Sequence, residues 1–192
     1  MSNQLVFSVL LISCSYIAHA GDLVATNGEA DLPTHVGTYM VSSDVREAAN
    51  KFATPESRVA YLSSVIASNA VDTNEVENFK KSSAIRLVSV IKSTNSIAIL
   101  VSNIDFVDAK YPERPAYYAL EVIGDPAVPY LLDTLKDPSA SPEQVKRVLE
   151  VLRYVKRAKY NPDQWEKFIE EEKKVLPPEL RGRIDRKVWV DD

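Results

Sequence analysis

The sequence has little of the chemistry that builds disulfide frameworks, zinc sites or nucleophilic active sites. It contains one cysteine, Cys14, and two histidines, His19 and His35, among 192 residues. A single cysteine cannot form an intrachain disulfide, and loss of the segment 1–20 would leave no thiol and one histidine. A His/Cys zinc centre is therefore excluded in such a mature chain, and we expect His35 to be an ordinary polar residue.

Glycine is also scarce, with five residues, and no Gly-rich phosphate loop, H-E-x-x-H helix or G-x-S-x-G elbow occurs. The aspartates between positions 105 and 137 lack the spacing of an EF-hand calcium loop. The 23 basic and 27 acidic residues give a net charge of -4, which disfavours non-specific binding to nucleic acid. The sequence therefore predicts a protein that is not an enzyme and has no cofactor or metal.

The N-terminal segment 1–20 has the pattern of a secretory signal peptide. An apolar run of about 13 residues (5–17) precedes Ala18-His19-Ala20, which fits the A-x-A cleavage rule. The run is shorter than the roughly 20 residues that a membrane span needs. We expect cleavage after Ala20 and an exported chain, secreted or periplasmic, with no membrane span.

Two alternatives remain for this segment. Leu11-Ile12-Ser13-Cys14 resembles a bacterial lipobox, and cleavage before Cys14 would give a lipoprotein anchored in a membrane. The run could also be a buried N-terminal helix of the fold. The mass of the intact protein separates a start at Gly21, a lipidated Cys14 and an uncleaved chain.

The rest of the chain divides into an irregular leader (21–53) and a helical domain (54–192). Three segments combine a helix-capping residue, a proline and an acid, and each is followed by apolar residues at helical spacing: Thr54-Pro55-Glu56, Ser141-Pro142-Glu143 and Asn161-Pro162-Asp163. Each predicts the start of a helix. The charged tail after Pro178 is expected to cover the end of the domain.

The segment from Ile123 to Pro129 predicts a sharp corner between two helices. Gly124 can adopt the positive φ that ends a helix, Asp125 can cap the next one, and Pro126 fits its first turn. A second copy of this pattern precedes it in the chain. Val88 and Ile91 align with Leu120 and Ile123 at an offset of 32, whereas Ile97, Leu100 and Ile104 align with Val128, Leu131 and Leu135 at an offset of 31.

This pattern resembles the HEAT-type helical repeat, most clearly over residues 84–137. The residues that carry the resemblance are Ala116, Ala119 and Leu120 before the corner, and Pro129, Leu131, Leu132, Leu135 and Asp137-Pro138 after it. The resemblance implies an all-α fold, a right-handed αα-superhelix forming a short solenoid. It also implies a binding scaffold, because stacked helix pairs leave one long open surface.

We therefore expect a non-catalytic, exported scaffold that binds a protein or peptide partner. Tyrosine is favoured at interfaces because it combines apolar area with a polar tip. The candidate partner-binding residues are Tyr117, Tyr118, Arg153, Tyr154 and Arg157. Two other functions remain open: a structural envelope lipoprotein anchored at Cys14, and an accessory domain of a lyase or hydrolase system. HEAT-like units resemble those of phycobilin lyases, which hold a tetrapyrrole.

Overall fold

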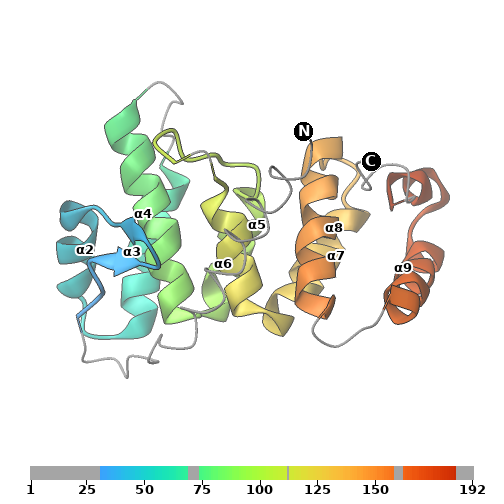
Figure 1. The fold of residues 1–192 in the computed structure, drawn as a ribbon, viewed down its shortest axis with the longest axis horizontal. Coiled ribbons are helices and arrows are strands. Elements are labelled where there is room, and N and C mark those ends of the chain that lie inside the picture. Colours follow the sequence, from blue (N-terminus) through green and yellow to red (C-terminus); the bar gives the residue numbers. More distant parts are fainter. Residues whose placement is uncertain (1–30, 69–73, 112, 158–161, 185–192) are drawn as a thin grey trace, which may run out of the picture.

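The computed structural model describes residues 31–68, 74–111, 113–157 and 162–184, and most of these residues are helical (Figure 1). The all-α class predicted from the sequence is confirmed. The α-helices are α2 (Ser43–Asn50), α3 (Pro55–Ala67), α4 (Glu75–Ile91), α5 (Ile97–Ser102), α6 (Pro115–Ile123), α7 (Val128–Lys136), α8 (Pro142–Arg157) and α9 (Pro162–Val175). The 3-10 helices are η1 (Thr94–Ser96), η2 (Asp125–Ala127) and η3 (Pro178–Ile184).

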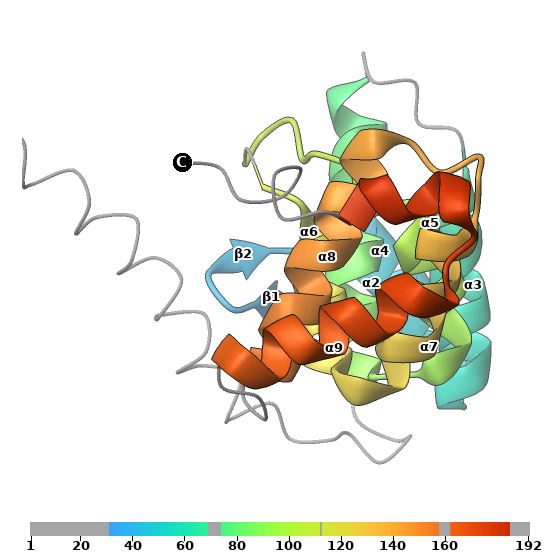
Figure 2. The ribbon, with the colours of Figure 1, turned by 90° about the vertical axis from the view of Figure 1, so that its right-hand side faces the viewer.

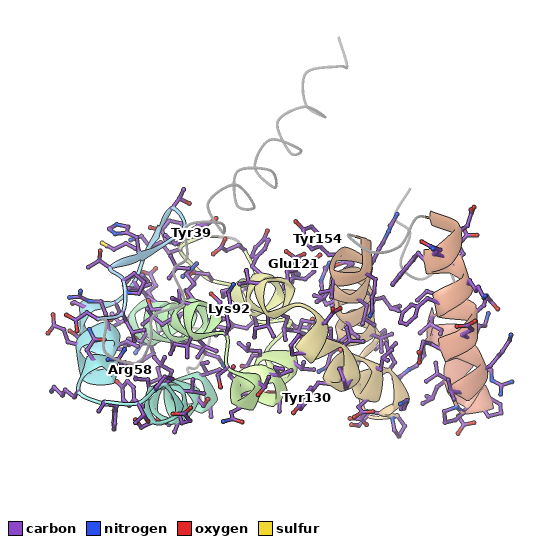
Figure 3. The ribbon with its side chains drawn as sticks, turned by 90° about the horizontal axis from the view of Figure 1, so that it is seen from below. Tyr39, Arg58, Lys92, Glu121, Tyr130 and Tyr154 are labelled. Atoms are coloured by element: carbon purple, nitrogen blue, oxygen red, sulfur yellow. The ribbon has the colours of Figure 1, made fainter. Side chains whose placement is uncertain are left out.

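The helices form two layers. Helices α4, α6 and α8 pack side by side in one layer, and α3, α5 and α7 form the other. Each helix of one layer packs on a helix of the second, in the pairs α3 with α4, α5 with α6, and α7 with α8. Helix α9 follows α8 at the end of the row (Figures 1 and 3). The apolar core runs between the layers, so each layer keeps one outward surface.

The caps predicted from sequence are present where the structure describes them. The Thr54 hydroxyl accepts a hydrogen bond from the Ser57 N–H (3.2 Å), and the Ser141 hydroxyl accepts one from the Gln144 N–H (3.0 Å). Helices α3 and α8 begin at Pro55 and Pro142, one residue after these caps. Asn161 lies outside the described residues.

The two predicted corners have the same order of elements. Helix α4 is followed by Lys92 with φ 52°, η1 and α5, whereas α6 is followed by Gly124 with φ 75°, η2 and α7. Lys92 and Gly124 occupy equivalent positions, and so do Ile97 and Val128, so the later corner is one residue shorter than the earlier one. Five aligned pairs are buried in both copies, whereas Ile91, Ile123 and Val128 are half-buried. The buried pairs are Ala84 and Ala116, Leu87 and Ala119, Val88 and Leu120, Leu100 and Leu131, and Ile104 and Leu135.

One detail of the second corner differs from the prediction. The residue that precedes α7 is Ala127, and Asp125 begins η2 instead of capping α7. Asp125 forms an ion pair with Lys156 of α8 at 3.7 Å. The prolines of this segment, Pro126 and Pro129, each occupy a first turn, where the missing N–H leaves no bond unmade.

The region expected to be an irregular leader contains regular structure. Strands β1 (His35–Val36) and β2 (Tyr39–Met40) form an antiparallel hairpin around Gly37, whose φ is 59°. Helix α2 follows and packs on α3 and α4. The reason is tertiary packing, since Val36, Val45 and Ala49 are buried in the common core. The predicted signal peptide, 1–20, lies outside the described residues.

The end of the row is covered by η3, which packs on α8 and α9. Leu180 and Ile184 are buried, and the Arg183 guanidinium donates to the backbone carbonyls of Asp137 (2.8 Å) and Ala140. The predicted covering segment continues to residue 192, and its residues 185–192 lie outside the described part of the structure. None of the helices in the described ranges is long and apolar enough to span a membrane.

Candidate binding face

The predicted partner-binding residues lie on two neighbouring helices of one layer. Tyr117 and Tyr118 belong to α6, Arg153 and Tyr154 belong to α8, and α6 packs against α8. The three tyrosines are half-buried and Arg153 is exposed. Arg157 is the last residue of α8, and its side chain lies outside the described part of the structure. The structure therefore brings four of the five candidates to the same pair of helices.

We call the outward surface of α4, α6 and α8 the α4/α6/α8 face. Figure 3 places Tyr39, Glu121 and Tyr154 along this face and Tyr130 on the opposite side of the row. Figure 2, seen along the row, shows the β1–β2 hairpin on the same side as α6 and α8, away from α3, α5 and α7. The hairpin thus contributes to the α4/α6/α8 face beside α4.

Tyr117 and Tyr118 form an aromatic pair on α6. Their ring centroids lie 5.5 Å apart at an interplanar angle of 77°, which is an edge-to-face arrangement. Burial raises the pKa of Tyr117, and the charges of Glu121 and Glu150 raise it further. Burial also raises the pKa of Tyr118, with the charges of Glu113 and Glu121 acting in the same direction. Both phenols therefore stay neutral and can donate hydrogen bonds at physiological pH.

Glu121 lies one helical turn after Tyr117 and was not among the residues predicted from the sequence. Burial raises the pKa of the Glu121 carboxyl to about 8, and a hydrogen bond from Tyr117 opposes this shift only in part. None of the ion pairs found among the described residues involves Glu121. A half-buried carboxyl outside these ion pairs is an unusual feature of the face.

A buried ionic network supports the part of the face formed by α4. The Arg86 guanidinium donates to the Asp108 carboxylate at 2.8 Å and also pairs with Glu113. The Ser82 hydroxyl bonds both Arg86 and Asp108. Arg86 is 2% exposed and Asp108 is 1% exposed. Burial opposes ionisation of Asp108, but hydrogen bonds from Ser82, Arg86 and the backbone N–H groups of Lys110 and Tyr111 outweigh it and lower its pKa.

Two tyrosine rings lie against the same guanidinium. The Arg86 Cζ is 4.6 Å from the Tyr39 ring centroid and 5.8 Å from that of Tyr111. The two rings contact each other edge to face at 5.3 Å. Burial raises the pKa of Tyr39, and its hydrogen bond to Glu113 raises it further. The network therefore joins three segments: the hairpin, α4 and the 103–114 loop.

Basic side chains of α8 are engaged within the protein. Arg147 pairs with Glu150 at 2.7 Å and with Glu143 at 2.5 Å. Lys156 pairs with Asp125 and lies 6.0 Å from the Phe168 ring centroid. The charges of Arg147 and Lys156 are thus balanced by acids of α8 and η2.

The polar side chains that cluster on the α4/α6/α8 face define the chemistry it can offer. The described residues contain no group of three or more His, Cys, Asp or Glu side chains that could hold a metal ion. His35 is exposed on the hairpin, where its ring bonds the neighbouring Thr34 hydroxyl at 3.1 Å. The polar groups that do cluster are phenols, carboxylates and guanidinium groups, which suit hydrogen bonding and charge pairing.

The residues predicted from the sequence did not include Arg86 or Glu121, although each has a signal in the sequence. Arg86 stands between the apolar residues Ile85 and Leu87 of α4, and a charged residue in such a stretch is a candidate for a buried ion pair. Glu121 follows Tyr117 at a spacing of four residues, which places both on one side of α6.

Comparison of this chain with known protein families, curated proteins and solved structures finds no match. The α4/α6/α8 face is therefore characterised from its own residues.

Proposed function

We propose that this protein is an exported, non-catalytic HEAT-like scaffold that binds a protein or peptide partner on the α4/α6/α8 face. The observation that carries the proposal is a set of half-buried tyrosines on two neighbouring helices of one layer. Tyr154 lies on the outward surface in Figure 3, and Tyr117 and Tyr118 of α6 lie one turn before Glu121, which is on the same surface. Neighbouring helices of one layer present side chains at regular intervals, which suits an extended ligand.

The HEAT-like part of the proposal is supported by the repeated corner. Two successive units share a helix end with positive φ, a 3-10 turn and a second helix, with Lys92 and Gly124 at equivalent positions. We further propose that the units follow a right-handed superhelix, as the HEAT resemblance implies. The proposed export depends on the Ala18-His19-Ala20 pattern, and the mass of the intact protein tests it against a lipid anchor at Cys14.

Tyrosine chemistry supports binding of a partner to this surface. Tyr117, Tyr118 and Tyr154 expose part of each side chain while their positions are fixed by packing, so little side-chain freedom would be lost on binding. Arg153 lies next to Tyr154 and is exposed. Aromatic and arginine side chains carry a large share of the binding energy in protein interfaces.

Affinity capture with surface variants tests the proposal. The wild-type chain is immobilised and exposed to the extracytoplasmic fraction of its source, and the retained protein is quantified by mass spectrometry. We expect Arg153→Glu combined with Tyr154→Ser to reduce the specifically retained protein at least tenfold. The matched control is Tyr130→Ser, because Tyr130 is 42% exposed on the opposite side of the row. Equal loss in both variants, or no loss in either, would reject this face as the binding surface.

A further inference from the structure

Glu121 differs from the other carboxylates that surround α6. Other acids in and beside α6 each have a basic partner: Glu113 and Asp108 pair with Arg86, Glu150 pairs with Arg147, and Asp125 pairs with Lys156. The groups that influence the ionisation of Glu121 are its own burial and the Tyr117 hydroxyl. A carboxylate in this position is stabilised by any cation brought to it from outside.

Elsewhere in the protein, tyrosine rings and carboxylates together surround a cationic side chain, the guanidinium of Arg86. Around Arg86, two tyrosine rings lie within 6 Å of the guanidinium carbon, and two carboxylates pair with it. Around Glu121, the ring pair Tyr117 and Tyr118 stands beside a carboxylate, and Tyr154 lies on the same face (Figure 3). The second set has the aromatic and acidic components of the first, and Glu121 is in none of the ion pairs of the described residues.

We propose that Glu121, together with the Tyr117 and Tyr118 rings, receives a cationic side chain of the bound partner, either a lysine ammonium or an arginine guanidinium. This inference rests on the proposed function, because it specifies the chemistry of the partner at that face. The carboxylate supplies the charge and the rings supply cation–π contact, a combination that selects a cation over a neutral group of equal size.

Other charged groups around α6 are compatible with this assignment. From α8, Glu150 adds negative charge near Tyr117, and Arg147 is held by Glu150 and Glu143. From α4, Arg86 is buried against Asp108 and Glu113. Arg114 precedes α6 and acts on Tyr118 against the charges of Glu113 and Glu121. Arg86 and Arg147 are thus held by other acids, which leaves the Glu121 carboxyl for a cation of the partner.

Cation binding at Glu121 is coupled to release of a proton. With a pKa of about 8, the carboxyl is mostly protonated at neutral pH, and the incoming cation favours its ionised form. Lysine and arginine side chains keep their charge over the same range. Affinity for a cation is therefore expected to rise with pH, by up to tenfold per pH unit below that pKa.

Nuclear magnetic resonance with a matched pair of probes tests the inference. The cationic probe is N-acetyl-arginine methylamide, and the neutral control is N-acetyl-citrulline methylamide, which has nearly the same shape. We expect saturable shifts of the Tyr117, Tyr118 and Glu121 signals with the arginine probe, and at least tenfold weaker binding of the citrulline probe. Binding of the arginine probe is expected to be at least tenfold tighter at pH 8.5 than at pH 6.5.

Two variants complete the test. Glu121→Gln is expected to remove the preference for arginine over citrulline, while Glu56→Gln keeps it, because Glu56 lies exposed on α3 in the other layer. The inference is overturned by equal binding of the two probes, by no binding of the arginine probe, or by an undiminished preference in Glu121→Gln. If a protein partner still binds the α4/α6/α8 face in those cases, the proposed function stands and only its cationic contact is rejected.

Discussion

Arg86 on α4 and Asp108 in the loop between α5 and α6 form an ion pair 2.8 Å long, with 2% of the first side chain and 1% of the second exposed. Asp108 also accepts hydrogen bonds from the backbone N–H groups of Lys110 (2.9 Å) and Tyr111 (3.2 Å). One carboxylate therefore shapes the loop and neutralises a buried guanidinium. The pair anchors the α4 end of the face.

Asp108→Asn is expected to destabilise the protein strongly. The amide retains an oxygen for the loop, but the buried Arg86 charge keeps only Glu113 as a neutralising partner, which costs about 3 kcal/mol of the free energy of unfolding. Urea denaturation followed by circular dichroism measures the loss. The control is Asp133→Asn, which disturbs an exposed pair with Lys136 and is expected to cost less than about 0.5 kcal/mol. Equal losses in the two variants would contradict a buried anchor.

The pH dependence of stability is expected to reveal Asp108 at acidic pH. Its pKa is lower in the folded protein than in the unfolded chain, where a free aspartate has a pKa of about 3.9. The unfolded state therefore takes up the proton first as pH falls. The stabilisation by Asp108 is present above pH about 4 and is lost as pH falls through its folded pKa. The gap in stability between wild type and Asp108→Asn should narrow below pH about 4, and a constant gap would contradict this.

The pKa shift of Glu121 has the opposite direction from that of Asp108, so its effect on stability has the opposite dependence on pH. Its pKa is raised to about 8 in the folded protein from about 4.3 in the unfolded chain, so the folded state binds more protons between these values. The free energy of unfolding is therefore expected to fall as pH rises from about 4 to 9. Glu121→Gln should match the wild type near pH 4 and exceed it at pH 9 by several kcal/mol, with about 5 kcal/mol for the full difference between the two pKa values. Denaturation series at both pH values measure this, and a difference that does not change with pH would refute the shift.

Substitutions at the two corner residues, Lys92 and Gly124, are expected to change the stability of the protein in opposite directions. Lys92 has φ 52° and ψ 33°, a left-handed conformation that costs a non-glycine residue energy, so Lys92→Gly is expected to stabilise the protein by about 0.5 to 1 kcal/mol. Gly124 has φ 75° and ψ -136°, and Gly124→Ala is expected to cost about 1 to 3 kcal/mol.

The cost at Gly124 would come from the backbone and not from a clash, since an added Cβ would meet only the Glu121 carbonyl oxygen at 3.9 Å. Thermal unfolding of both variants, measured side by side, tests the pair. Destabilisation by Lys92→Gly, or tolerance of alanine at position 124, would show that the two corners do not have the conformations described.

The sequence was most informative where structure is set by neighbouring residues. Thr54 and Ser141 predict helix starts because their hydroxyls cap the backbone within three residues. Gly124 predicts the second corner for the same local reason, and the repeat alignment then locates Lys92 in the first. The sequence alone did not indicate a positive φ at Lys92, because lysine has no preference for that conformation.

Features that depend on distant residues were not predicted. The hairpin and α2 form where an irregular leader was expected, because Val36 and Val45 find a place in a core built by later helices. The partners of Arg86 lie 22 and 27 residues away in the chain, a separation that no local pattern encodes. The tyrosines of the face were found from composition, whereas the burial of Glu121 required the packing of α6 in the stack.

Site-specific photo-cross-linking from the two sides of the row gives the decisive test of the proposed binding face. A benzophenone amino acid is placed at position 118 on the α4/α6/α8 face, and in a second protein at position 130 on the opposite side. Both proteins are irradiated in the extracytoplasmic fraction of the source. We predict one saturable protein adduct from position 118 and none from position 130. An adduct from position 130 alone, or equal adducts from both, would contradict a partner site on the α4/α6/α8 face.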